Sequence, residues 1–225
     1  EGYVPDTFVD GPLVTALRDG SLLYLEEINR VPEETLNVLV TVMAERELHV
    51  PRLGHIVAAP GFRLVAAMNP FDAVGTARIS SAIYDRTCRV AMGYQEASDE
   101  LEILRRATEG ATPSQPDESW MEKVIDLTRA TRDHSDIRVG SSVRGAIDMV
   151  LVAVNLAELR AEPIGSINVG LDAALAALSG RIRIHEGCGR SADDLVRALW
   201  ASIFLTSDDI PEPDQGKVTG PATTT

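Results

Sequence analysis

The fold is decided by the stretch Ser21-Leu22-Leu23-Tyr24-Leu25-Glu26-Glu27-Ile28-Asn29-Arg30. A short apolar run bounded by turn signals indicates a buried strand. The run leads directly into Glu26 and Glu27, so both carboxylates lie at the carboxyl end of that strand, where α/β folds place their ligand sites. One acid of such a pair can hold Mg²⁺ beside a phosphate while the other orients an attacking water. On this stretch alone, a buried strand that ends in a solvated acidic turn is the alternative.

The segments that follow predict a helix and two more strands. Pro32 suits the first turn of a helix. The helix that follows has one apolar face. Arg63–Met68 is a second apolar run, which indicates another buried strand ending at Asn69. A third strand-like run, Cys88–Gly93, follows Asp85-Arg86. The apolar face of the helix consists of Leu36, Leu39, Val40 and Met43.

Residues 46–62 have the pattern of a hairpin, because a glycine-containing loop separates two short β-branched runs. His49 and His55 lie on it. Two isolated histidines with no third ligand nearby in the sequence are more typical of solvated hairpin residues than of a metal site.

The pattern is helical almost throughout from Ser98 to about Thr206. Ser98 is expected to cap a helix that carries Asp99 and Glu100 in its first turn, where carboxylates suit the helix dipole. Leu101, Leu104 and Ala107 are expected to line one face of it. Residues 207–225 are rich in proline and threonine, which predicts a disordered tail. Further helices are expected to start near Trp120 and to cover Ser142–Leu159, Ala173–Leu178 and Leu195–Leu205.

Composition narrows the class of protein. The net charge of −13 over 225 residues argues against a general nucleic-acid binder, which needs a basic surface. Cys88 and Cys188 lack CxxC spacing, which favours two reduced thiols in a cytoplasmic protein. No apolar run approaches the roughly 20 residues of a membrane helix, so we expect no membrane partner. The chain begins with Glu1 rather than methionine, and we expect it to be a fragment.

Taken in order, these motifs resemble the AAA+ ATPases of the MoxR branch, whose relatives include activases that work beside von Willebrand factor A-type proteins. The resembling motifs lie close together over roughly the first 95 residues. The segments that carry it are Phe8-Val9-Asp10-Gly11-Pro12-Leu13, Leu22 to Pro32, Met43-Ala44-Glu45-Arg46, Ala59-Pro60-Gly61-Phe62, Ala67-Met68-Asn69-Pro70, Gly75-Thr76 and Tyr84-Asp85-Arg86.

The resemblance implies an α/β fold followed by an all-α part. Residues 1–95 would be the C-terminal part of a P-loop NTPase parallel-sheet core, residues 96–206 a helical lid subdomain, and residues 207–225 the tail. It also implies ATP and Mg²⁺ as cofactors, neighbouring subunits of a homo-oligomeric, hexameric ring, and a client protein such as a von Willebrand factor A-domain protein.

The resemblance also assigns roles to the carboxylates and to Asn69. Glu27 matches the Walker B glutamate, which polarises water for attack on the γ-phosphate. Glu26 stands where most members have aspartate, on the Mg²⁺ side. Asn69 matches sensor 1, whose amide can hold the attacking water or a phosphate oxygen. The alternative for Glu26 and Glu27 is that they are two surface acids. The alternative for Asn69 is a turn-forming asparagine before Pro70.

Two arginines complete the implied site. Arg86 resembles an arginine finger, which acts on the nucleotide of a neighbouring subunit. Arg89 and Arg78 could serve instead, and a surface ion pair with Asp85 is the alternative. Arg144, within Gly140-Ser141-Ser142-Val143-Arg144-Gly145-Ala146, partly matches sensor 2. Here valine replaces the family's proline and glycine its alanine, and a solvated arginine at a helix start is the alternative.

The sequence contains no GxxxxGKS or GxxxxGKT, the loop whose amides and lysine cradle phosphates. In the resembling family this loop lies upstream of Gly2, so we expect truncation, and poor ATP binding by the chain as printed. The implied function is an ATPase that couples hydrolysis to remodelling, activation or metal or cofactor insertion in a partner. A catalytically impaired scaffold of the same fold is the second hypothesis.

Overall fold

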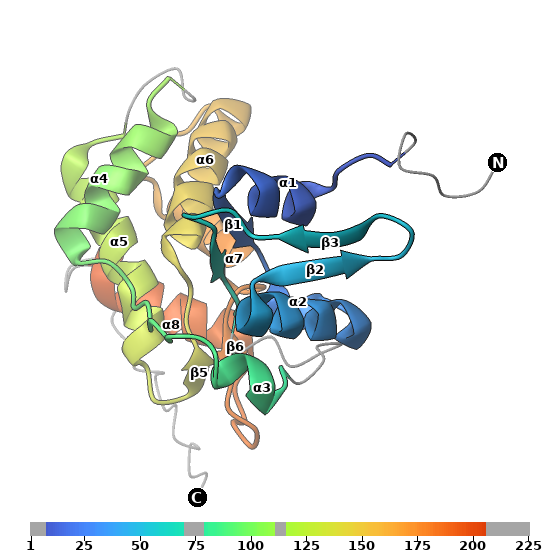
Figure 1. Cartoon of the computed structure of the whole chain (residues 1–225). Helices are drawn as coiled ribbons and strands as arrows, with labels where there is room; N and C mark the ends of the chain where they lie inside the picture. Colours follow the sequence, from blue (N-terminus) through green and yellow to red (C-terminus); the bar gives the residue numbers. More distant parts are fainter. Residues whose placement is uncertain (1–7, 70–78, 111–115, 206–225) are drawn as a thin grey trace, which may run out of the picture. The chain divides into compact units, whose positions relative to one another are not determined.

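A computed structural model describes residues 8–69, 79–110 and 116–205 of the chain (Figure 1). The chain divides into two compact units, Glu1–Met92 and Gly93–Thr225, which we call unit 1 and unit 2. Unit 1 mixes strands with helices, whereas unit 2 is mainly helical. The loop around Gly75-Thr76 and the expected tail both lie outside the described residues.

Unit 1 is built on a parallel strand pair and an antiparallel hairpin. β1 (Leu22–Leu25) runs parallel to β4 (Arg63–Ala66). Parallel neighbours need a long crossover connection, and here it carries a helix and the predicted hairpin of β2 (Glu47–Val50) and β3 (Gly54–Val57). The helical elements of this unit are α1 (Pro12–Asp19), the 3₁₀ turn η2 (Ile28–Arg30), α2 (Glu33–Glu45) and α3 (Ser81–Tyr84).

A glycine brings the starts of the two parallel strands together. α1 ends at Gly20, whose φ of 65° is left-handed. A Cβ on Gly20 would lie 2.4 Å from the carbonyl oxygen of Pro60, so only glycine fits there. The Ala59 N–H also donates to the Leu17 carbonyl oxygen at 2.8 Å. The loop before β4 is thereby fixed against the end of α1, directly ahead of β1.

Helix α2 confirms the predicted apolar face and extends it. Leu36 and Leu39 are buried, and Val40 and Met43 are partly buried against the same cluster. Val42, which the sequence pattern did not single out, is fully buried in a second cluster with residues of α1 and β1. α2 therefore packs on two sides. Pro32 caps the helix rather than lying within its first turn.

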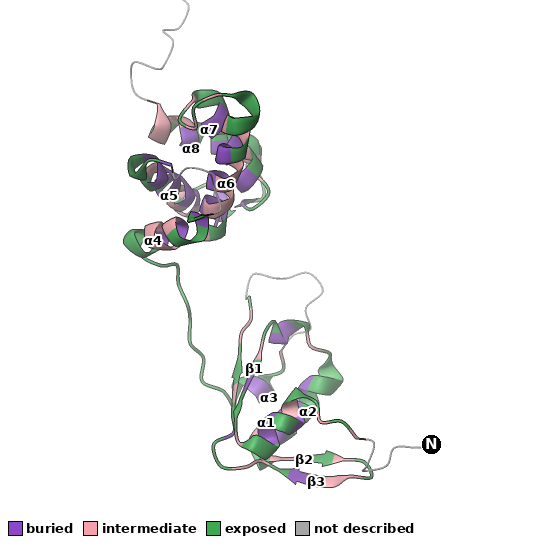
Figure 2. Cartoon of the chain, turned by 90° about the horizontal axis from the view of Figure 1, so that it is seen from above, coloured by how far each residue is buried: buried purple, intermediate pink, exposed green. Residues whose placement is uncertain are grey.

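The prediction that both parallel strands are buried was wrong. Leu23 is 6% exposed, but Leu22 is 61% and Tyr24 54% exposed, and Val65 on β4 is exposed as well. Among the described residues β1 pairs with β4 alone. Side chains alternate between the two faces of a strand, so a two-stranded sheet with one covered face leaves every second side chain in contact with solvent. Figure 2 shows this mixture of burial along β1.

The third predicted strand was also wrong. Cys88–Gly93 contains no regular secondary structure, and Met92 in it is 89% exposed. A strand exists only where its backbone groups pair with a neighbour. None of the described strands pairs with this segment. Its apolar residues favour a strand, but none of the described strands lies alongside to pair with it.

Unit 2 confirms the helical pattern and adds two short strands that the sequence did not predict. β5 and β6 pair antiparallel, with Ile137 opposite Ile184. No helix in the described ranges is both long and apolar enough to cross a bilayer. In order, the elements are α4 (Ala97–Thr108), α5 (Glu118–Asp133), β5 (Ile137–Val139), α6 (Val143–Arg160), α7 (Ile167–Leu178), β6 (Arg183–Ile184) and α8 (Ala192–Phe204).

The first helix of unit 2 begins earlier than predicted. Glu96, not Ser98, is the N-cap residue of α4. The predicted acidic first turn is present, and Glu100 in it is fully buried. At the other end Ala107 is exposed and Thr108 is buried, because the Thr108 hydroxyl donates to the Leu104 carbonyl oxygen at 2.9 Å and needs no water.

One continuous core holds the helices of unit 2 together (Figure 2). On α6, Val150 and Val154 are buried, while Val143, Ile147 and Leu151 are only partly buried. The most buried side chains of this core include Leu104, Leu127, Met149, Leu178 and Leu195. Small residues on α6 and α7 let these two helices approach closely, and they include Ala146, Ala153, Ala173 and Ala177.

Candidate functional site

Two backbone hydrogen bonds extend the parallel pairing beyond the ends of β1 and β4. The Ala67 N–H donates to the Leu25 carbonyl oxygen at 2.8 Å, and the Ile28 N–H donates to the Ala67 carbonyl oxygen at 3.1 Å. The turn Glu26-Glu27 is therefore held beside the chain that leads to Asn69. Both emerge at the carboxyl edge of the parallel pair, the edge at which open α/β sheets bind ligands.

Glu27 has a backbone conformation that the sequence did not predict. Its φ and ψ of 51° and 46° lie in the left-handed region, which is uncommon for a residue with a side chain. Residues in such sparsely populated regions concentrate at functional sites. The Glu27 carboxylate lies 3.2 Å from Arg30 Nε, and both side chains are more than half exposed. A surface pair of this kind contributes little, so the carboxylate can leave Arg30 for a ligand.

Glu26 is exposed, and its carboxylate has no hydrogen bond or ion pair to any described residue. The described ranges contain no group of three or more histidine, cysteine, aspartate or glutamate side chains placed to hold a metal. Mg²⁺ typically takes one or two carboxylates and fills its remaining positions with water and phosphate oxygens. Glu26 offers one exposed carboxylate of this kind.

Asn69 is exposed and takes part in a polar interaction. It lies two residues beyond Ala67, the residue that pairs with both Leu25 and Ile28. Pro70, on which the alternative of a simple turn depends, lies outside the described residues.

Arg86 follows α3 and is exposed. Its Nη1 donates to the Ala82 carbonyl oxygen at 3.0 Å, and no ion pair joins it to Asp85 in the described structure. The guanidinium thus caps its own helix and keeps further donors for a partner. Arg89 is exposed too, whereas Arg78 lies outside the described residues.

Arg144 is the second residue of α6 and belongs to unit 2, while the other candidates belong to unit 1. Its side chain is exposed. The neighbouring Gly145 is explained by packing, because a Cβ there would lie 2.1 Å from Ser141 Oγ and 2.8 Å from Leu178 Cδ2. The glycine that replaces the alanine of the resembling family is therefore required by the turn before α6.

Sequence reasoning missed Asn29. Only 7% of this residue is exposed, and its side-chain oxygen has no hydrogen-bond partner among the described residues. The sequence signal that could have found Asn29 is an amide side chain two residues after Glu27, in a turn where exposed residues are expected. His49 and His55 were interpreted as solvated, and both are exposed, with ring centroids 4.8 Å apart across the hairpin.

Comparison with known proteins relates most of unit 1 to a known family. Residues 4–87 match the family profile of the AAA domain, dynein-related subfamily. An uncharacterized protein of Staphylococcus epidermidis is 32% identical over 155 residues, which cover 66% of this chain and 57% of that protein. One of Staphylococcus haemolyticus is 29% identical over the same span and coverage. This chain thus spans little more than half the length of these relatives.

Among solved structures, NtrX of Brucella abortus in complex with ADP has a TM-score of 0.41 and 17% identity. The match covers 69% of this chain and 38% of that one. The family match over residues 4–87 supports an AAA+ ATPase-like, nucleotide-binding domain in unit 1. Glu26, Glu27, Asn69 and Arg86 all fall within the matched residues, and Arg144 does not.

Proposed function

We propose that this protein is a MoxR-type AAA+ ATPase, which couples ATP binding and hydrolysis to the remodelling, activation or metal or cofactor loading of a partner protein. The observation that carries the proposal is the pairing of Ala67 with Leu25 and Ile28. It holds two exposed carboxylates beside the approach to Asn69, within the residues that match the AAA family. A water-activating acid, a metal-side acid and an amide are the groups that phosphoryl transfer to water needs.

Each candidate has a role in this proposal. Glu27 orients and polarises the attacking water, and its backbone is left-handed. Glu26 holds the Mg²⁺ that neutralises phosphate charge. Asn69 donates from its amide to the attacked phosphate or accepts from the water. Arg86 stabilises the transferring phosphate of a neighbouring subunit, and Arg144 contacts phosphates from the helical lid.

The proposed setting is a homo-oligomeric ring in the cytoplasm. Residues 1–95 would supply the core and residues 96–206 the lid. An arginine finger acts on a neighbour, so a ring, hexameric in this proposal, completes each site. A von Willebrand factor A-domain protein is the proposed client.

A specific observation favours a second candidate, a scaffold of the same fold without ATP turnover. Glu26 occupies the position at which the resembling family carries aspartate. The longer side chain moves the carboxylate outward by one methylene, which changes its reach to a metal.

Steady-state ATP hydrolysis by the full-length protein decides between the two. The variants are Glu27→Gln, which keeps the shape but not the charge, and Glu34→Gln, a control on the exposed start of α2. We expect turnover in the parent, a loss of about 10²-fold or more in the first variant, and no change in the control. A parent that assembles without hydrolysing ATP would establish the scaffold instead.

A further inference from the structure

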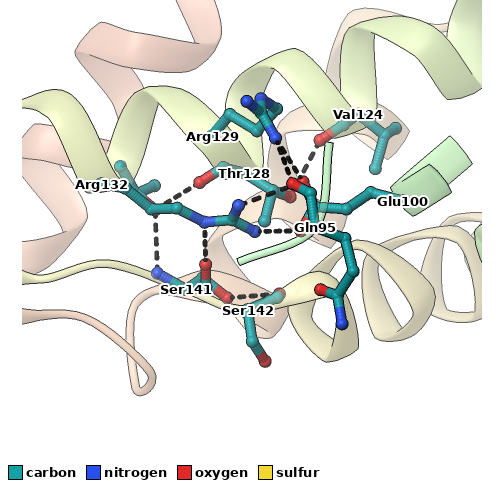
Figure 3. A network of polar contacts seen from close by, with 9 residues as sticks. Gln95, Glu100, Val124, Thr128, Arg129, Arg132, Ser141 and Ser142 are labelled. Atoms are coloured by element: carbon teal, nitrogen blue, oxygen red, sulfur yellow. Dashed lines mark hydrogen bonds and ion pairs between the residues drawn. The ribbon is translucent and has the colours of Figure 1, made fainter. Parts of the chain in front are cut away.

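A buried carboxylate in unit 2 organises a polar network that the proposed site does not use (Figure 3). Glu100 is fully buried in the first turn of α4. Its carboxylate accepts from both terminal nitrogens of Arg132, at 2.6 Å and 3.0 Å, and from Arg129 Nη1 at 3.0 Å. A two-point contact between guanidinium and carboxylate fixes geometry as well as charge. Glu100 therefore orients both arginines of α5.

The two arginines hold the segment at the beginning of unit 2. Arg129 Nη1 donates to the Gln95 carbonyl oxygen at 3.0 Å. The guanidinium of Arg132 lies over the ring of Tyr94, 3.9 Å from its centroid, which is a cation–π contact. Tyr94 and Gln95 are thereby attached to α5. Cys88–Gly93, just before them, has no regular secondary structure.

Arg132 also holds the turn that precedes α6. Its Nε donates to the Ser141 carbonyl oxygen at 2.7 Å, and the Ser141 N–H donates to Thr131 Oγ1 at 2.9 Å. Gly140 lies directly against α5, since a Cβ there would be 2.6 Å from the Arg132 Cα. Arg144 follows three residues after Ser141. The side chain of Arg132 is only 9% exposed, so it joins these segments from inside the unit.

We propose that Glu100 is a positioning residue. Through Arg132 it fixes the start of α6, and with it Arg144, relative to Tyr94 and Gln95. The proposal rests on the proposed function only in giving Arg144 a contact with nucleotide phosphates. Stability alone does not require this network, because a buried ion pair is often no better than a well-packed apolar cluster. Three attachments on the one guanidinium, to Glu100, Tyr94 and Ser141, specify geometry.

The first test is hydrogen exchange on the full-length protein, which needs no nucleotide. In the Glu100→Gln variant we expect amide exchange to rise about tenfold or more in both Tyr94–Glu96 and Gly140–Ala146. The control is Asp172→Asn, which removes the exposed ion pair between Asp172 and Arg160 at 2.7 Å. It should leave both segments unchanged. A rise confined to one segment overturns the proposal.

A second variant keeps the test decisive if Glu100→Gln does not fold. Tyr94→Leu removes the ring over Arg132 and leaves the carboxylate in place. If the segments are coupled, exchange rises in Gly140–Ala146, to which the contacts of the described residues connect Tyr94 through Arg132. Unchanged exchange there means that the two segments are held independently, and the proposal is wrong.

The second test is a double-mutant cycle on ATP turnover. Glu100→Gln should lower kcat/KM for ATP by about tenfold or more. In an Arg144→Ala background, Glu100→Gln should lower kcat/KM by less than about twofold, because the side chain through which it acts is already absent. Effects that multiply would show that Glu100 does not act through Arg144. A parent without turnover refutes the proposed function, while the exchange result still decides whether Glu100 couples the two segments.

Discussion

The two units differ in where they place their buried residues. Unit 2 has one continuous core that every one of its long helices contributes to. Unit 1 divides its buried residues between two smaller clusters, one around Leu17 and Phe62 and one around Leu36 and Ile83. Of its parallel strands, β1 exposes every second side chain and β4 exposes three of its four residues. The helical unit is therefore organised by packing, and the strand-containing unit by backbone pairing.

The exposure of key charged groups also differs between the two units. In unit 1 the carboxylates of Glu26 and Glu27 and the guanidinium of Arg86 are exposed, where a ligand can reach them. In unit 2 the carboxylate of Glu100 is sealed between two arginines. Exposed groups with few fixed partners are free to react, whereas buried, fully paired groups fix geometry. We infer that most of the proposed reacting groups belong to unit 1, Arg144 excepted, and that Glu100 positions segments of unit 2.

The largest effect is expected at Arg86. Arg86→Ala should lower ATP turnover of the full-length protein by about 10³-fold, because the transition state loses a guanidinium. Its unfolding should change little, since Arg86 makes one exposed hydrogen bond to its own helix. The measurement is kcat beside a thermal unfolding curve.

Mixing variants tests whether Arg86 acts on a neighbour. Rings assembled from Arg86→Ala and Glu27→Gln subunits contain some sites with an intact Glu27 facing an intact Arg86. We expect the mixture to regain turnover that neither variant has alone. No recovery in stable mixed rings would mean that Arg86 works within its own subunit or not at all.

The next largest effect tests whether the cores of the two units unfold independently. Leu127→Ala should destabilise unit 2 by about 3 kcal/mol, because the side chain is fully buried and its loss leaves a cavity. Both tryptophans, Trp120 and Trp200, lie in unit 2, so their fluorescence follows the unfolding of that unit. Leu17→Ala, an equally buried truncation in unit 1, should shift the fluorescence transition less. Equal shifts would show that the chain unfolds as one.

The sequence predicted most of the fold and failed where a partner decides the outcome. Helical periodicity located α2 and α4 to α8, and the β-branched runs around Gly54 located the hairpin. Burial of β1 and strand formation at Cys88–Gly93 were not decided locally. Both depend on which strands lie alongside, and hydrophobic periodicity in the sequence does not show this. The short pair β5–β6 was missed because two or three residues give no period to measure.

For the site, the sequence predicted residue types and their order but not their environment. It placed Glu26 and Glu27 after a strand, and the structure puts them beside the approach to Asn69. The left-handed φ of Glu27 and the burial of Asn29 cannot be recognised from the residue types in the turn. The burial of Glu100 depends on arginines 29 and 32 positions away, which its place in the first turn does not show. The roles of these residues stay predictions.

A smaller effect is expected at Gly140. Gly140→Ala should destabilise unit 2 by about 2 kcal/mol, since the new methyl group would meet the backbone of Arg132 at 2.6 Å. Gly165→Ala is the matched control, because a Cβ there has open space around it. Urea unfolding followed by tryptophan fluorescence compares the two. Equal stability would mean that α5 and the turn before α6 are not held as closely as the structure has them.

A modest effect is expected at the start of α8. Ser191 and Asp194 form a capping box, and the hydrogen bonds from the Ser191 hydroxyl and backbone N–H lower the pKa of Asp194. Ser191→Ala should cost unit 2 about 1 kcal/mol near neutral pH. A carboxylate with a lowered pKa stabilises the fold above its unfolded pKa, and that stability is lost as pH falls through the folded pKa. The difference between parent and variant should therefore shrink in acid, when measured by urea unfolding.

The smallest effect is expected on the exposed face of β1, and it tests the comparison most directly. Tyr24→Ser should cost less than about 0.5 kcal/mol, since that ring is more than half exposed. Leu23→Ser, one residue away on the covered face, should cost several times more, because a hydroxyl would replace apolar contacts there. Amide exchange of β1 and β4 in the full-length protein measures both. If Tyr24→Ser proves as costly as Leu23→Ser, another part of the protein or a second chain covers this face. Unit 1 would then also be organised by packing, and the contrast with unit 2 would narrow to where the charged groups lie.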